Sequence, residues 1–207
     1  MNVASSLISF TLAATLLTIT PGLDTAMILR TSMTQSAKTA TKAGLGIIAG
    51  CLVWGAAVAV GLGLLITASP LAFGALKWAG AIYLVWFGVQ LFRQPRLYLG
   101  HTTAVAAGPQ RNWIIKGLLQ NLLNPKIGVF YVSFLPQFVP PTMPAVSYTF
   151  FLAVVHASLT IIWFAILITA TRPIARLLQR PGFIKTIDRL TGCVFIAFGA
   201  RLALAQR

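Results

Sequence analysis

Six long apolar stretches account for nearly the whole of this 207-residue chain. Each is close to the length of about 20 residues with which an α-helix crosses a bilayer. Hydrophobic residues make up 57% of the chain and charged residues 9%, against roughly 45–50% and about 25% in a soluble domain. We therefore predict an all-α integral membrane protein with six transmembrane helices, in a single domain over residues 1–207. The stretches lie at about 4–28, 44–67, 72–92, 114–138, 147–171 and 187–205.

Basic residues gather in alternate links between these stretches. Twelve of the sixteen Lys and Arg residues flank the links after the first, third and fifth stretches, whereas the links at 68–71 and 139–146 carry no charge. The positive-inside rule predicts that the basic links are cytoplasmic, so both termini face the periplasm. Nucleic-acid binding is not expected despite the net charge of +14, because no link is long enough to form a domain. The twelve are Arg30, Lys38, Lys42, Arg93, Arg96, Arg111, Lys116, Arg172, Arg176, Arg180, Lys185 and Arg189.

Neither a cleaved leader nor a metal or cofactor site is expected. Met1-Asn2-Val3 supplies no basic n-region, and the first apolar stretch continues past Pro21, so we expect it to be retained. Cys51 and Cys193 lie singly in apolar stretches without metal-ligand spacing, which predicts packing roles. The chain has no His-Glu-x-x-His motif and no paired acids, so a membrane-embedded enzyme is not expected.

Because each half has three stretches, an odd number, the second half starts on the opposite side of the membrane from the first. Opposite orientation of two halves is typical of an inverted repeat. The first stretch of each half is interrupted by a proline, in Thr20-Pro21-Gly22 and in Asn124-Pro125-Lys126. The third stretch of each half closes with a shared pair, Phe87-Gly88 and Phe198-Gly199. We predict a 3+3 inverted repeat with halves at about 1–92 and 112–207.

The two prolines predict new half-helices that begin inside the membrane. Thr20 and Asn124 are good N-cap residues, and Pro21 and Pro125 suit the first helical position. A half-helix N-terminus presents free amide N–H groups and a positive dipole end, which suit a carboxylate. Alternatively, both prolines are only kinks, which membrane helices tolerate.

Asp24 and Lys126 place opposite charges beside the two breaks. An acid at membrane depth is costly enough that it is usually functional. A site with a holder for an anion and a holder for a cation fits a zwitterion. Asp24 and Lys126 also fit a structural pair that neutralises two buried charges, and such a pair is compatible with a gate that opens for substrate.

Three other features have two interpretations each. His156, in the fifth stretch, fits either a proton relay or a hydrogen-bonded core residue. Gly46 and Gly50 predict close helix contact, within one bundle or between the protomers of a homodimer. Tyr131 is interpreted as a packing aromatic rather than part of a ligand cage.

Together these motifs resemble the LysE/RhtB family of amino-acid exporters over essentially the whole chain. The resemblance implies proton-driven efflux of an amino acid or close derivative across the bacterial inner membrane. From the breaks, the buried charges and the imidazole, we predict that the substrate-binding or proton-coupling residues are Thr20, Pro21, Gly22, Asp24, Asn124, Pro125, Lys126 and His156. The segments that carry the resemblance include Thr20-Pro21-Gly22-Leu23-Asp24-Thr25, Gly44-Leu45-Gly46, Asn121-Leu122-Leu123-Asn124-Pro125-Lys126 and Phe134-Leu135-Pro136-Gln137-Phe138.

Two positions depart from the family pattern. Leu23 replaces the second proline of the family's Pro-Gly-Pro, and Cys51 follows Gly50 where members often carry an acidic or polar residue. The second departure argues against a cationic amino acid. With Asp24 expected as the only buried acid, we predict a neutral substrate. The alternative is export of another small solute or cation on the same fold.

Overall fold

The computed structural model describes residues 2–68, 70–93, 112–178 and 180–204, which exclude Arg96 and Arg111 of the predicted basic link. Within these residues every regular element is helical, as predicted. The elements are α1 (Val3–Ile19), α2 (Leu23–Thr34), α3 (Ala37–Ala68), α4 (Pro70–Arg93), α5 (Trp113–Leu122), α6 (Pro125–Val129), the π-helix η2 (Phe130–Phe134), the 3-10 helix η3 (Leu135–Phe138), α7 (Ala145–Thr169), α8 (Thr171–Leu178) and α9 (Pro181–Leu204).

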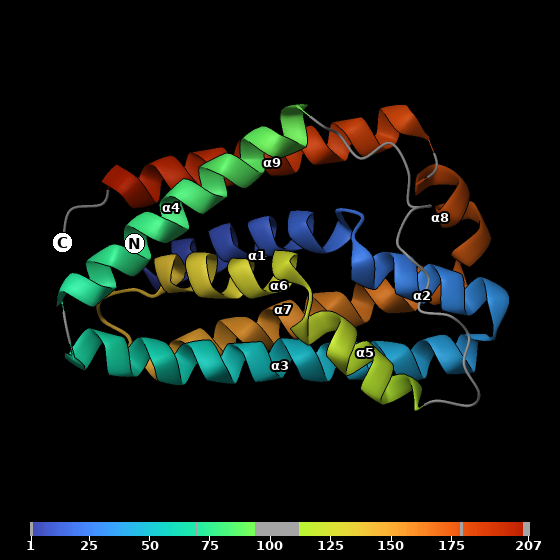
Figure 1. The fold of residues 1–207 in the computed structure, drawn as a ribbon, viewed down its shortest axis with the longest axis horizontal. Helices are drawn as coiled ribbons and strands as arrows, with labels where there is room; N and C mark the ends of the chain where they lie inside the picture. The colour runs from blue at the N-terminus through green and yellow to red at the C-terminus, as the bar shows by residue number, and fades with distance from the viewer. Residues whose placement is uncertain (1, 69, 94–111, 179, 205–207) are drawn as a thin grey trace.

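The helices form an elongated bundle with two outer pairs and a central layer (Figure 1). α4 packs against α9 along one side, and α3 packs against α7 along the other, with α5 crossing α3. α1 and α6 lie between these pairs. The start of α1 and the end of α9 lie at one end of the bundle, whereas α8 and the end of α2 lie at the other.

Two helices in the described residues are long and apolar enough to cross a membrane alone, Ala37–Gly61 and Ala145–Thr169. The pair α1 and α2 passes together as a third crossing, bent by 50° at the predicted break. The predicted fourth stretch is not one helix with a single break, because it divides into α5, α6, η2 and η3. Pro136 has no N–H to donate, which is one reason that an α-helix does not continue through this segment.

Close backbone contact joins α3 to α5. A Cβ at Gly46 would lie 1.9 Å from the carbonyl oxygen of Ile114, and a Cβ at Gly117 would lie 2.0 Å from that of Ala43. Any side chain larger than hydrogen would force the two helices apart. The contact predicted from Gly46 and Gly50 is therefore made within one chain.

α4 and α9 meet through glycines in the same way. A Cβ at Gly88 would lie 2.8 Å from the carbonyl oxygen of Gly192, and the reverse contact is also 2.8 Å. A Cβ at Gly199 would lie 3.0 Å from the carbonyl oxygen of Ala81. The Phe-Gly pairs that suggested a repeat thus include glycines that bring the third stretches of the two halves together.

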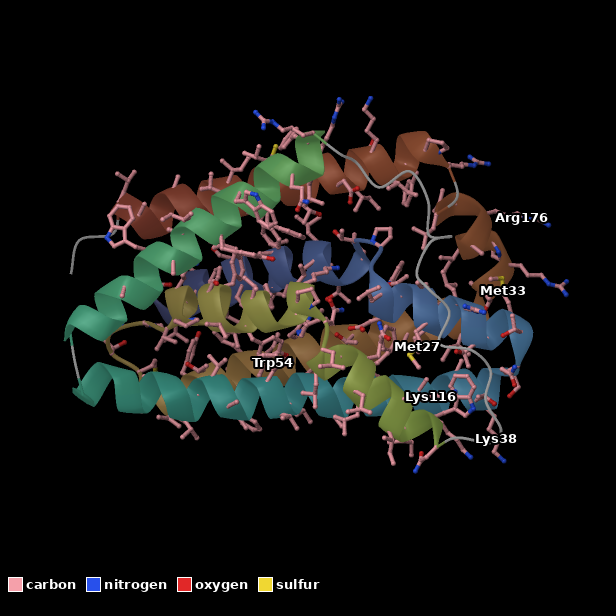
Figure 2. The ribbon with its side chains drawn as sticks, in the orientation of Figure 1. Met27, Met33, Lys38, Trp54, Lys116 and Arg176 are labelled. Carbon is pink, nitrogen blue, oxygen red and sulfur yellow. The ribbon has the colours of Figure 1, made fainter. Side chains whose placement is uncertain are left out.

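Basic side chains lie at one end of the bundle. Figure 2 shows Lys38 of α3, Lys116 of α5 and Arg176 of α8 at the end where α2 stops. Lys38 and Arg176 are exposed, and the Lys116 ammonium lies 4.2 Å from the centre of the Trp113 ring. Links far apart in sequence therefore bring their positive charges to the same end.

Candidate functional site

The first break separates α1 from α2, but not in the predicted way. Thr20 is the C-cap of α1, and its N–H donates to the Leu16 carbonyl at 3.0 Å. Its φ of −62° and ψ of 120° are extended, as expected for a residue that precedes a proline. The N-cap of α2 is Gly22. The prediction that Thr20 caps a new helix with Pro21 in its first position is therefore wrong.

The second break matches the prediction. Asn124 is the N-cap of α6, where its Oδ1 accepts the Lys126 backbone N–H at 3.1 Å, and Pro125 occupies the first turn. Asn124 is 3% exposed, so this cap lies inside the protein. The helix that starts here continues as η2 and then η3.

Lys126 connects the two breaks. Its Nζ donates to the carbonyl oxygen of Leu17 at 2.8 Å and to that of Thr20 at 2.9 Å. These carbonyls belong to the last turn and the C-cap of α1, where an α-helix leaves acceptors unsatisfied and its dipole end is negative. The Lys126 side chain thus caps α1 from the other half of the chain.

Asp24 lies in the first turn of α2, where the helix dipole favours a carboxylate. Its Oδ2 accepts a hydrogen bond from Asn121 Nδ2 at 2.9 Å. Its Oδ1 is buried and has no hydrogen-bond partner among the described residues, and the Asn124 side chain lies close to the same carboxylate. One acceptor of this acid is therefore available to a ligand.

A cavity that is partly open to solvent lies where the two breaks meet α3 and α7. Its position midway along these two helices is where transporters with broken helices bind substrate. The predicted residues Gly22, Asp24, Asn124, Lys126 and His156 all line it, whereas Thr20, Pro21 and Pro125 do not. The remaining lining residues are Leu17, Thr18, Thr25, Cys51, Ile127, Thr160 and Phe164.

His156 has a polar partner that the sequence did not suggest. The Tyr131 hydroxyl lies 2.9 Å from His156 Nδ1, and the two side chains are 0% and 2% exposed. Tyr131 is therefore more than a packing aromatic. Cys51, interpreted as a small packing residue, contacts the same hydroxyl and lies 3.5 Å from Asn121 Nδ2. The sequence feature that could have indicated these polar contacts is Asn121, a polar residue inside an apolar stretch.

Asp188, the second acid, is also buried. It is 0% exposed on α9, so the expectation that Asp24 is the only buried acid is wrong. Asp188 lies one turn before Thr191, whose hydroxyl is 2.6 Å from Thr20 Oγ1. It does not line the cavity. Asp24 is therefore the acid of the cavity on which the expectation of a neutral substrate depends.

A metal site is not formed by the described residues, among which no three His, Cys, Asp or Glu side chains come together. The cavity offers one carboxylate, one ammonium, one imidazole, one thiol and several hydroxyl and amide groups. Such a set can bind a small polar molecule that carries a positive charge.

Comparison with known proteins shows which family the chain belongs to. The family model described as LysE type translocator matches residues 15–206. The chain belongs to this family. As a LysE-type translocator it is a membrane transport protein, and its helices with long apolar stretches agree with that.

Similar translocators have been named for their cargo. A "Homoserine/homoserine lactone efflux protein" of Salmonella typhimurium is 32% identical over 198 residues, covering 96% of each chain. A "Leucine efflux protein" of Klebsiella pneumoniae is 28% identical over 201 residues, covering 96% of this translocator and 95% of the relative. An uncharacterized membrane protein of Bacillus subtilis is 26% identical over 208 residues, covering 97% and 99%. No solved structure matches this translocator.

Proposed function

We propose that this translocator exports a small neutral amino acid or a close derivative across the bacterial inner membrane in exchange for protons. The observation that carries the proposal is the cavity at the junction of the two breaks, with Asp24 and Lys126 in its lining. The names of relatives, for efflux of homoserine, homoserine lactone and leucine, support the substrate class.

Asp24 is the proposed holder of the substrate ammonium. Its Oδ1 is buried without a hydrogen-bond partner among the described residues, and a buried acceptor gains from a charged donor. Asn121 fixes the other oxygen, so the carboxylate is oriented before substrate arrives.

The start of α2 is the proposed holder of the substrate carboxylate. Gly22 provides no side-chain cap, and the first helical bond runs from the Ala26 N–H to the Gly22 carbonyl. The amides before Ala26 therefore lack helical acceptors, as at any helix N-terminus. Gly22, Asp24 and Thr25 line the cavity. Lys126 contributes its charge to the same space while its Nζ caps α1.

The proposed topology has six crossings in a 3+3 inverted repeat, with both termini in the periplasm. The gathering of Lys38, Lys116 and Arg176 at one end of the bundle supports a cytoplasmic assignment for that end (Figure 2). Accessibility tags in the link at 97–110 and at both termini test it. A cytoplasmic C-terminus would contradict the six-crossing arrangement.

Protection of Cys51 from a thiol reagent tests the site. The chain has two cysteines, and Cys193 is exposed, so Cys193→Ser leaves Cys51 as the only target. We expect a small methanethiosulfonate to modify Cys51 through the cavity, and homoserine or leucine to slow that reaction. The control is Asp24→Asn in the same background, in which protection should weaken. If no amino acid slows the modification or leaves loaded vesicles, the proposed function is wrong.

A second candidate is export of a small organic cation that lacks a carboxylate. The specific observation in its favour is that the Lys126 Nζ already donates to two carbonyls of the protein. Leucine amide and homoserine lactone are the discriminating probes in the Cys51 experiment. Protection by these probes alone would favour the second candidate, whereas better protection by the free amino acids favours the first.

A further inference from the structure

A chain of polar side chains runs along the back of the cavity. Asn121 Nδ2 donates to Asp24 Oδ2 at 2.9 Å and lies 3.5 Å from Cys51 Sγ. Cys51 Sγ in turn contacts the Tyr131 hydroxyl, which lies 2.9 Å from His156 Nδ1. These five side chains are called the polar chain below.

Three of the five members of the polar chain face the substrate space. Asp24, Cys51 and His156 line the cavity, whereas Asn121 and Tyr131 are 0% exposed and lie behind it. The members come from α2, α5, α3, η2 and α7, so packing of the whole bundle assembles them. Burying polar groups costs free energy unless they bond to one another, and an apolar set could fill this space. The π-helical segment that carries Tyr131 is of a kind that occurs frequently at functional sites.

When His156 is neutral, the hydrogen bonds of the polar chain from Asn121 onward can all run in one direction, each donor giving its hydrogen toward His156. Asn121 donates to the Cys51 sulfur, the Cys51 thiol can then donate to the Tyr131 oxygen, and the Tyr131 hydroxyl donates to His156 Nδ1. In this state the ring carries its one hydrogen on Nε2.

Protonation of His156 reverses the donor and acceptor roles in the part of the polar chain nearest to it. One proton is added to the ring, both nitrogens then carry hydrogen, and Nδ1 becomes a donor to the Tyr131 oxygen. The Tyr131 hydrogen must turn toward Cys51 Sγ, which then accepts it. The Cys51 thiol needs a new acceptor, and Asn121 Oδ1 is a buried oxygen without a hydrogen-bond partner among the described residues. The change therefore reaches the amide that orients Asp24.

The charges around His156 make the proton and the substrate compete. Lys126 of α6, Asp24 of α2, Cys51 of α3 and Tyr131 of η2 are the titratable groups that face or share its space, and α1 contributes only Leu17 and Thr18. A protonated His156 adds a positive charge beside Lys126 in a cavity with one carboxylate. Like charges at such distances repel strongly away from water.

We propose that Tyr131 couples proton binding at His156 to substrate binding at Asp24, so that the cavity holds either the added proton or the substrate ammonium. This inference rests on the proposed function. Tyr131 acts as a positioning residue, because it lies behind the cavity and touches His156 and Cys51 rather than the substrate. The consequence is exchange, because the proton and the substrate occupy the cavity in turn and do not cross the membrane together.

Tyr131→Phe tests the coupling in inverted membrane vesicles, with labelled homoserine as the probe and leucine as a second. Accumulation driven by an acidic lumen requires proton coupling, whereas exchange of labelled for unlabelled probe at equal pH does not. We expect accumulation to fall about tenfold, the effect of one lost hydrogen bond to a charged group, with exchange retained. Tyr148→Phe is the matched control, because Tyr148 is also buried and its hydroxyl contacts Ser6 far from the cavity.

The outcomes separate coupling from folding and from the transport proposal. Equal loss of accumulation and exchange in Tyr131→Phe, or full retention of both, would overturn the coupling. Cys51→Ala interrupts the polar chain with a smaller change, and it should also lower accumulation more than exchange. If this variant lowers both equally, the coupling is again contradicted. Wild-type vesicles that show neither mode with either probe would overturn the proposed function and the coupling with it.

Discussion

The two breaks have similar sequences and different means of support. At Asn124-Pro125 the cap is local, since the amide side chain serves a backbone N–H two residues away. At Thr20-Pro21 the carbonyls of the ended helix are satisfied by Lys126, which lies 106 and 109 residues further along the chain. The break that starts α6 is stabilised by its own residues, whereas the break that ends α1 depends on a lysine from the other half of the chain.

Lys126→Gln should reveal this dependence through the largest effect. The shorter amide cannot reach both carbonyls, and each buried acceptor left unsatisfied costs about 1–3 kcal/mol, or roughly 2–6 kcal/mol for the pair. Thermal unfolding in detergent should show a large loss of stability. Lys42→Gln is the control, because Lys42 is exposed on α3. A variant as stable as the wild type would break the comparison, since the first break would then need no distant cap.

Asp24→Asn sharpens the same comparison from the functional side. An amide at position 24 still accepts from Asn121, so the fold should persist while the substrate ammonium loses a charged acceptor. We expect export to fall roughly ten- to a hundredfold, corresponding to about 1.5–3 kcal/mol. Initial rates of export from loaded cells provide the measurement. Asp188→Asn is the control, because Asp188 is buried but does not line the cavity.

The double variant Asp24→Asn with Lys126→Gln separates a substrate site from a structural charge pair. If the two groups serve only to neutralise each other, removing both charges should restore export. Near-normal export would contradict the assignment of Asp24 to the substrate. We expect no recovery, because the Lys126 ammonium would still be missing from the end of α1.

Asn124→Ala should have a smaller effect than Lys126→Gln. It removes a single N-cap, which typically costs about 1 kcal/mol. Unfolding midpoints of the two variants and the wild type, measured under the same conditions, show which substitution lowers stability more. An equal or larger loss in Asn124→Ala would reverse the order that the comparison predicts.

Pro21→Ala should have the smallest effect. Lys126 rather than Pro21 satisfies the Leu17 and Thr20 carbonyls, so the bend of 50° should remain. Distances between spin labels on α1 and α2 test this. A marked lengthening, as for one straight helix, would show that the proline and not the lysine maintains the break.

Sequence reasoning reached the features that local chemistry decides. The apolar stretch at 147–171 lies within two residues of α7 (Ala145–Thr169) at each end, and the Asn124 cap was predicted correctly. Thr20 was misassigned because a residue before proline is kept out of the helical region and therefore ended the preceding helix. The partners of Lys126 could not be found, since no spacing relates residues more than a hundred positions apart. The polar contacts of Tyr131 and Cys51 could not be predicted either, because they form only when the helices pack around Asn121.

The glycine contacts bear on which parts of the molecule can move. α3 and α4 belong to the first predicted half, and α5 and α9 to the second, yet close glycine contacts join α3 to α5 and α4 to α9. Halves that rocked as rigid bodies would have to slide these backbones past each other. A disulfide engineered between α3 and α5 should therefore leave export intact, whereas one between α3 and α4 should stop it. The reverse result would indicate that the two predicted halves move as rigid bodies.

These contacts imply two rigid units, α3 with α5 and α4 with α9, and each unit combines one helix from the first predicted half with one from the second. Each outer pair also contains one helix from the first predicted half and one from the second. A mutation in one predicted half can then change the packing of a helix from the other. Glycine should consequently vary less among relatives at positions 46, 88, 117 and 192 than residues do elsewhere in the chain, which alignment of many relatives can measure.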